Sequence, residues 1–430
     1  MVAACSGGFG NHCAIYFAIH HANNRATNQK SPMAVLQSPS KPEPGTSLFS
    51  AQFVLLLAVT TLFGLSFSTY FLLPKFLAVE LAADPVTIGS VTTIFWLASA
   101  LTVPFVGGQI DRRGRKVFAA AGGLILALSC AGFLWVDSVG PLIWALRILQ
   151  GIGFTLFYIA VATLATDLSP PARLGQALGI FGAVMIFTNA VGPAFAEWTS
   201  EHFGWRTVFA ATAVTSVLAA VFSRLIHEQR HAPPAGGQHT SLLAVLRRPG
   251  MLPVTIISAM VGWVFGTLFT FYQPWALSLG IKKVAIYLVA YAVAAVAVRV
   301  LCGDLADRLG RLRVVRAMLL VYVLAPLALI WLDYFGLFIA GAVLGLTQGI
   351  YYPALNAVAI DLATPAERGK VMAAYNGAFN LGLSAAGLVL GHVVIATDYR
   401  TVFVLACVVS MAAFGLLALT PARGNAGRVG

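Results

Sequence analysis

The sequence predicts an all-α polytopic membrane protein with 12 transmembrane helices, arranged as two six-helix halves with both termini in the cytoplasm. Three observations predict this fold class: the apolar composition, the distribution of positive charge and an internal repeat. Of the 430 residues, 59% are hydrophobic and only 10% are charged, whereas soluble domains carry about 25% charged residues. A chain of this composition cannot cover a soluble surface, so a lipid bilayer is its expected environment.

Stretches of about twenty apolar residues alternate with short polar connections from Phe49 onward, and each can cross a hydrocarbon core of about 30 Å. The halves are predicted at 49–224 and 251–421, joined by a cytoplasmic linker at 225–250 that is rich in proline and glycine. Cytoplasmic tails are predicted at 1–48, which we expect to be disordered, and at 422–430; Met33 is an alternative start to Met1. The predicted spans are 51–73, 87–108, 117–136, 140–163, 175–197, 205–224, 252–277, 284–303, 314–332, 335–360, 370–396 and 401–420.

The positive charges support this topology. Of the 27 lysines and arginines, 20 fall in the segments predicted to be cytoplasmic, five fall on the opposite side and two lie within spans. Such an excess is typical of the cytoplasmic face of membrane proteins. The formal net charge of +12 is therefore a topology signal, and no nucleic-acid partner is expected.

An internal repeat divides the chain into two similar parts. The stretch Gly107–Arg115 recurs 196 residues later, and Gln150–Ile152 recurs 198 residues later. A third repeated segment, Asp167–Gly175, recurs as Asp361–Gly369. An even number of spans per half makes the repeats parallel, which places a substrate site near the bilayer midplane between the halves.

These motifs resemble those of the major facilitator superfamily over residues 50 to 420. The stretch Gly107–Lys116 is similar to the family's signature between helices 2 and 3, G-x-L-x-D-R-x-G-R-K, although Gln109 replaces the usual leucine. The segment Arg147–Gly153 resembles the helix-4 motif of proton-coupled members, and Gly182…Pro193 is a partial match to the helix-5 motif of antiporters. The resemblance implies a bacterial efflux-type secondary transporter.

Charged residues at the cytoplasmic ends of the spans are predicted to form a gate. Carboxylates that face guanidiniums across the two halves would close the inner mouth through bidentate pairs. Pairs near water are weak enough to break in each transport cycle. A role in topology alone is the alternative, although topology needs no aspartates. The gate residues are Asp111, Arg112, Arg115, Asp167, Arg173, Asp307, Arg308, Arg311, Asp361 and Arg368.

Arg147 is predicted to lie inside the fourth span, where a charge costs at least ~2.5 kcal/mol on insertion scales. It shares one helical stripe with Gln150, Phe154 and Tyr158. The resemblance implies a role in proton coupling or in attracting an anionic substrate group. Snorkelling, or pairing with the backbone of the fifth helix, is the structural alternative.

Polar and aromatic residues at helical spacing mark other spans that would line the cavity. Amides in a bilayer also join neighbouring helices, so the role of each residue is either to bind substrate or to hold helices together. The glycines Gly377, Gly382, Gly387 and Gly391 indicate close helix packing. The candidate substrate or coupling residues are Arg147, Gln150, Tyr158, Asn189, Trp263, Gln273, Gln348, Tyr352, Asn356, Asn376 and Asn380.

No aspartate or glutamate is predicted deep inside a span, and Glu197 is placed at an outer end. Proton coupling then depends on Arg147 or on end carboxylates such as Glu197. A strong cation exporter would also need a buried acid, so neutral, amphipathic or anionic small molecules fit better as substrates.

The leading hypothesis is a proton-coupled exporter of a small organic molecule that works by alternating access. The alternatives are an uptake permease for an organic anion, with Arg147 as counter-charge, and a non-transporting membrane receptor or assembly factor. No HExxH, GxSxG or Walker motif is present, so an enzyme is not expected. The expected partners are the substrate, protons and the lipid bilayer. We expect no cofactor, no metal, a monomeric state and a bacterial inner (cytoplasmic) membrane location.

Overall fold

The computed structural model describes residues 48–170, 173–228, 247, 250–302, 305–362 and 368–419. At 107–108, 111–112, 307, 368–370 and 373 it describes the backbone only. These parts of the chain are helical, with no strand among them. Apart from Leu48, the predicted N-terminal tail lies outside the described residues, as does the C-terminal tail.

The first half of the described chain contains seven α-helices and two short 3-10 turns. They are α2 (Ala51–Thr69), η1 (Tyr70–Leu72), α3 (Leu73–Val79), α4 (Pro85–Arg113), α5 (Arg115–Gly132), η2 (Phe133–Trp135), α6 (Pro141–Asp167), α7 (Leu174–Phe203) and α8 (Trp205–Ser223). The second half contains α10 (Met251–Ser278), α11 (Ile286–Cys302), α12 (Leu305–Leu309), α13 (Arg311–Tyr322), α14 (Leu324–Ile330), α15 (Tyr334–Asp361), α16 (Arg368–Ala396) and α17 (Tyr399–Leu419).

Eleven helical segments of the described chain are long and apolar enough to cross a membrane. They correspond to eleven of the predicted spans. The remaining predicted span, 284–303, is found as α11, whose 17 residues rise about 26 Å at 1.5 Å per residue. The multi-pass helical character is thus confirmed, whereas the count of 12 and the cytoplasmic position of the termini stay predictions.

The predicted end of the fifth span is wrong. It was placed at residue 197, but α7 continues to Phe203 and ends only at Gly204, whose φ of 79° breaks the helix. Glu197 therefore lies almost two turns inside α7 and is only 7% exposed. A carboxylate that was expected at the outer end of a span is in fact buried. The prediction failed because polar residues near the end of a span do not show where the helix stops.

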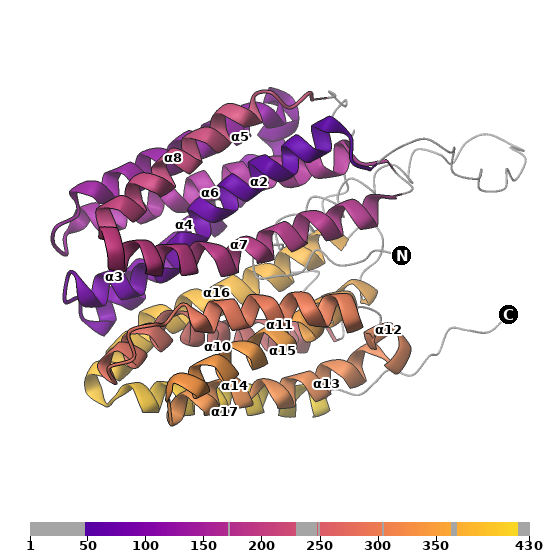
Figure 1. Ribbon diagram of the computed structural model, residues 1–430. Coiled ribbons are helices and arrows are strands. Elements are labelled where there is room, and N and C mark those ends of the chain that lie inside the picture. The colour runs from indigo at the N-terminus through magenta and orange to yellow at the C-terminus, as the bar shows by residue number, and fades with distance from the viewer. Residues whose placement is uncertain are drawn as a thin grey trace, which may run out of the picture.

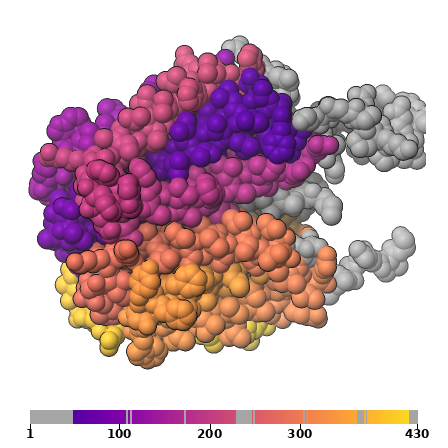
Figure 2. All heavy atoms as spheres, viewed as in Figure 1, coloured from indigo at the N-terminus to yellow at the C-terminus, as the bar shows by residue number. Residues whose placement is uncertain are grey.

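Helices α2 to α8 and α10 to α17 form two bundles that lie side by side (Figure 1), and the space-filling view shows them in contact along one seam (Figure 2). The main contacts between the bundles join α4 to α16 and α7 to α11. We call the end of the bundles that holds Leu48 and Leu419 the proximal end, and the opposite end, which holds Lys75 and Glu197, the distal end.

The seam is tightest near the distal end, where glycines let two backbones meet. A Cβ on Gly89 of α4 would overlap the carbonyl oxygen of Gly387 on α16, and one on Gly391 would lie 2.7 Å from the Pro85 oxygen. Thr93 donates to the Ser384 carbonyl nearby at 3.0 Å. The hydrogen bonds seen between described residues of the two halves all lie in this distal part. Small residues permit such close helix contacts in membranes.

Candidate functional site

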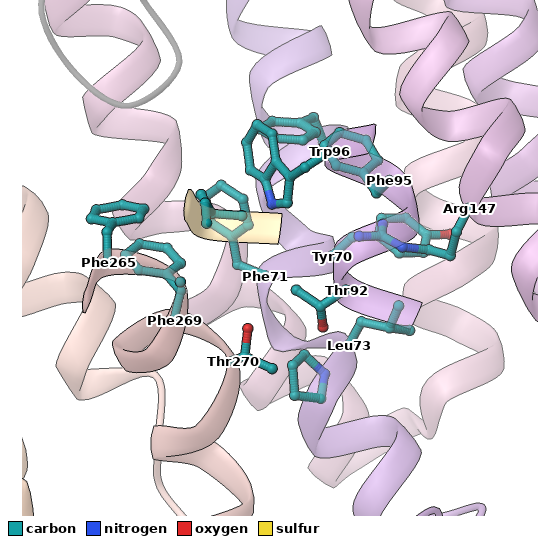
Figure 3. Close-up of a pocket in the computed structure, with 14 residues that line it drawn as sticks. Tyr70, Phe71, Leu73, Thr92, Phe95, Trp96, Arg147, Phe265, Phe269 and Thr270 are labelled. Carbon is teal, nitrogen blue, oxygen red and sulfur yellow. The ribbon is translucent and has the colours of Figure 1, made fainter. Parts of the chain in front are cut away.

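Aromatic residues make up half of the lining of a cavity between the two halves. Figure 3 shows Phe265 and Phe269 of α10 on one side and Arg147 of α6 on the other. The remaining walls come from α2, η1, α3, α4 and α16. Arg147 is the one formally charged residue among those that line it. The aromatic lining residues are Phe67, Tyr70, Phe71, Phe95, Trp96, Phe265 and Phe269.

The cavity is nearly closed in this conformation. Its volume is about 30 Å³, and a water molecule needs roughly 10–15 Å³ of such space, so there is room for only a few water-sized molecules. Phe71 and Phe269 come from opposite halves and meet edge to face, with ring centroids 5.6 Å apart. An organic substrate can therefore enter only when these rings move or the halves separate.

Arg147 is held at the cavity wall by three contacts. Its Nε donates to the Val91 carbonyl oxygen at 3.2 Å, and one Nη donates to Gln150 Oε1 at 2.6 Å. Its guanidinium carbon also lies 4.5 Å from the ring centroid of Phe95, a cation–π distance. The side chain is 5% exposed and does not snorkel. Its backbone partner belongs to α4, so the structural alternative of pairing with the backbone of the fifth helix is wrong.

The rest of the predicted helix-4 stripe supports the cavity from behind. Gln150 is buried, and its amide nitrogen lies 4.0 Å from the Cys130 sulfur. Tyr158 stacks on Phe154 with ring centroids 5.5 Å apart and does not line the cavity. Periodicity identified the correct face of α6, but this face extends past the cavity into the packed N-terminal half.

The predicted amides of the second half are buried and do not line the cavity. Tyr352 donates to Asn376 Oδ1 at 2.8 Å, and Gln348 accepts from the Tyr351 hydroxyl. Asn356, Asn380 and, on α7, Asn189 are also buried, while Trp263 on α10 is half-buried. In the described chain, Gln348 Nε2, Asn356 Oδ1, Asn189 Oδ1 and Trp263 Nε1 have no hydrogen-bond partner.

Gln273 lies at the distal seam rather than in the cavity. Its Nε2 donates to the Phe71 carbonyl at 2.7 Å, and its Oε1 accepts from the backbone amide of Lys75 at 3.1 Å. The side chain is fully buried. It therefore joins the halves in this conformation. This is the structural role that the sequence analysis gave as the alternative to substrate binding.

The predicted cytoplasmic gate pairs differently from the expectation. Arg115 pairs with Asp167 inside the first half, and Arg311 Nη1 lies 2.7 Å from Asp361 Oδ2 inside the second. The structure thus brings equivalent repeat residues together within each half, so pairing across the halves is wrong for these four. Each arginine begins a helix beside the end of its partner's helix, and this proximity is local to one bundle. Arg173 and Arg308 are exposed. The side chains of Asp111, Arg112, Asp307 and Arg368 lie outside the described set.

Two features of the site were not predicted from the sequence. The cavity aromatics carry the repeat, because Phe67 and Phe71 recur as Phe265 and Phe269 with the same 198-residue offset as Gln150 and Gln348. That offset was a usable signal. The second feature is Glu228 of the predicted linker, which accepts from the Arg115 and Lys116 amides at 2.6 and 3.3 Å and so caps α5.

Comparison with known proteins now identifies the family. The Major Facilitator Superfamily model matches residues 54–341 and 284–429. The chain belongs to the Major Facilitator Superfamily. It is accordingly a multi-pass membrane transporter and not an enzyme.

Curated relatives within the superfamily include multidrug transporters. The chain is 26% identical over 332 residues to multidrug resistance protein MdtG of Klebsiella pneumoniae (strain 342), covering 73% of this chain and 79% of that protein. It is 28% identical over 331 residues to MdtG of Serratia proteamaculans (strain 568), with the same coverage. These likenesses support an efflux-type member.

Solved superfamily structures share the fold. The POT family transporter PepTSo superposes with a TM-score of 0.71 at 14% identity, covering 87% of this chain and 98% of that one. A bacterial homologue of the lysosomal transporter Spinster, in an inward-facing and unoccupied conformation, gives a TM-score of 0.69 at 16% identity, with the same coverage. At these identities the likeness concerns the fold alone.

Proposed function

We propose that this superfamily member exports small, largely apolar organic molecules across a bacterial inner membrane, driven by the proton gradient. The relatives named multidrug resistance proteins support export. The helix-4 motif around Arg147 supports proton coupling. In this proposal the distal end faces away from the cytoplasm, the chain acts as a monomer, and substrate crosses as the halves rock against each other.

The observation that carries the proposal is the aromatic cavity between the halves. Rings from both halves, such as Phe95 and Phe269, offer faces and edges for stacking with a planar substrate, worth about 0.5–1.5 kcal/mol per good pair. The cavity lining contains no carboxylate. A polyvalent cation would find no counter-charge there. A neutral aromatic molecule needs none, and a weakly acidic one would have Arg147 as its counter-charge.

A second candidate is the uptake of an organic anion. It is favoured by Arg147, whose guanidinium borders the cavity and has a carbonyl, an amide oxygen and a ring as partners but no carboxylate among them. A substrate anion could provide the missing charge. The two candidates share the binding cavity and differ in direction and in substrate charge.

Transport by purified protein in liposomes tests both candidates. Liposomes containing a pH-sensitive dye receive a proton gradient and pools of neutral, anionic and cationic aromatic molecules. Export predicts that neutral aromatic pools move protons against substrate, whereas anion uptake predicts co-directional flux with anionic pools alone. Substrate movement without proton movement would overturn the coupling. No movement by folded protein with any pool would instead favour a receptor or assembly role.

A further inference from the structure

The distal end of the seam holds a buried ion pair that the cavity does not use. Lys75 Nζ of α3 lies 2.8 Å from Glu197 Oε1 of α7. The side chain of Lys75 is 9% exposed and that of Glu197 is 10% exposed. Both residues belong to the first half, so this pair alone does not join the two halves.

The same carboxylate also binds the second half. Glu197 Oε1 accepts from the backbone amide of Val284 at 2.8 Å, and Oε2 accepts from that of Ala285 at 3.2 Å. These residues directly precede α11, and their amides are among those that a helix start leaves unpaired. An ionised carboxylate is favourable at this position because it meets the positive end of the helix dipole.

Lys75 makes a second link across the seam. Its ammonium donates to the carbonyl oxygen of Lys282 at 2.7 Å, and its backbone amide donates to Gln273. The other charged group near the ammonium is Glu201, 3.6 Å away on the same helix as Glu197. Among the described residues, Glu201 makes no hydrogen bond or ion pair with the second half. The ion pair therefore holds the second half at two points, through a carboxylate and through an ammonium.

We propose that Glu197 and Lys75 form a lock that keeps the distal end closed, with Glu197 holding the start of α11. Opening this end must pull the Val284 and Ala285 amides away from a buried carboxylate, while the ion pair can stay intact within the first half. Hydrogen bonds to a charged acceptor are about twice as strong as neutral ones. The charge on Glu197 therefore sets how often the distal end opens. The lock is independent of the substrate and of the direction of transport.

Hydrogen–deuterium exchange of the full-length protein in detergent, without substrate, tests the lock. In Glu197→Gln, which keeps the shape but loses the charge, exchange at 284–285 and along the seam at 85–93 and 384–391 should accelerate by about tenfold. Glu201→Gln is the matched control, because it removes a carboxylate beside the same Lys75 without touching α11. Its exchange should stay within about twofold of the unaltered protein.

Lys75→Gln provides an independent test should Glu197→Gln fail to fold. It removes the ammonium bond to Lys282 and leaves the carboxylate on the α11 amides, so a smaller acceleration at the same distal segments is expected. Equal exchange in Glu197→Gln and Glu201→Gln would overturn the proposal. So would uniform acceleration that includes the α5 segment 115–132, because Glu197 would then stabilise the fold as a whole rather than the distal closure.

Discussion

Lys75 and Gln273 occupy equivalent positions in the two repeats, 198 residues apart, and they touch each other across the seam. The Lys75 amide donates to Gln273 Oε1 at 3.1 Å. One turn earlier, the equivalent residues Phe71 and Phe269 also meet, with ring centroids 5.6 Å apart. The two copies thus pair with each other near the symmetry axis of the repeat. Because one copy carries an ammonium and the other a neutral amide, the closure at the distal end is asymmetric.

Arg147→Ala should lower substrate-driven proton flux by at least about tenfold, equivalent to about 1.4 kcal/mol. The substitution removes the one formal charge of the cavity lining and leaves the Val91 carbonyl and Gln150 without their donor. Arg147→Lys should not restore flux, because an ammonium cannot reproduce two directed bonds and planar stacking on Phe95. The liposome assay measures both variants.

Arg206→Ala is the control for this experiment. Arg206 also pairs with one side chain, Asp137 at 3.2 Å, but both side chains are 75% exposed. Exposed pairs contribute about 0–1 kcal/mol, so its flux should match that of the unaltered protein. Full activity in Arg147→Ala would remove the residue from the mechanism.

Gly89→Ala should weaken the distal seam. The new Cβ would overlap the Gly387 carbonyl oxygen, which is backbone and cannot turn away, so α4 and α16 must part. Overpacking of this kind costs about 1–3 kcal/mol, visible as a lower thermal midpoint in detergent. Gly377→Ala on α16 is the matched control, because no atom lies within 4 Å of its Cβ position and the close packing predicted for this glycine is wrong. An equal loss in the two variants would contradict this account.

The two arginine–aspartate pairs of the proximal end should differ in their contribution to stability. The Arg115 and Asp167 side chains are 4% and 14% exposed, whereas those of Arg311 and Asp361 are 38% and 61% exposed. Breaking a buried pair costs about 3–5 kcal/mol, against about 0–1 kcal/mol for an exposed one. Arg115→Ala should therefore lower the thermal midpoint much more than Arg311→Ala. The reverse order would refute the burial argument.

Phe269→Ala should alter which substrates the protein binds. It removes the ring that closes the cavity against Phe71, so planar substrates should bind about two- to tenfold more weakly and bulkier ones should gain access. Binding is measured with substrates identified in the liposome screen. Phe105→Ala on α4, where the ring is 71% exposed, should leave the substrate profile unchanged.

Composition, apolar stretches and motifs were sufficient to predict the helical, multi-pass class and the family. Long apolar stretches have few alternatives to spanning a bilayer, because backbone groups must be satisfied within each span. Arg147 was also identified correctly as a buried charge on the inner face of its helix. These features follow from composition, length and periodicity, which are local properties of the chain.

The packed structure was needed to show which residues meet. It placed Glu197 inside α7 and onto the start of α11, paired Arg115 with Asp167 rather than across the halves, and put Gln273 at the seam instead of the cavity. It also brought the repeated phenylalanines of both halves to one cavity. The physical reason is that periodicity shows which face of a helix is buried, but not which neighbour covers that face. That choice depends on helix ends, rotation and the closed conformation of the two halves.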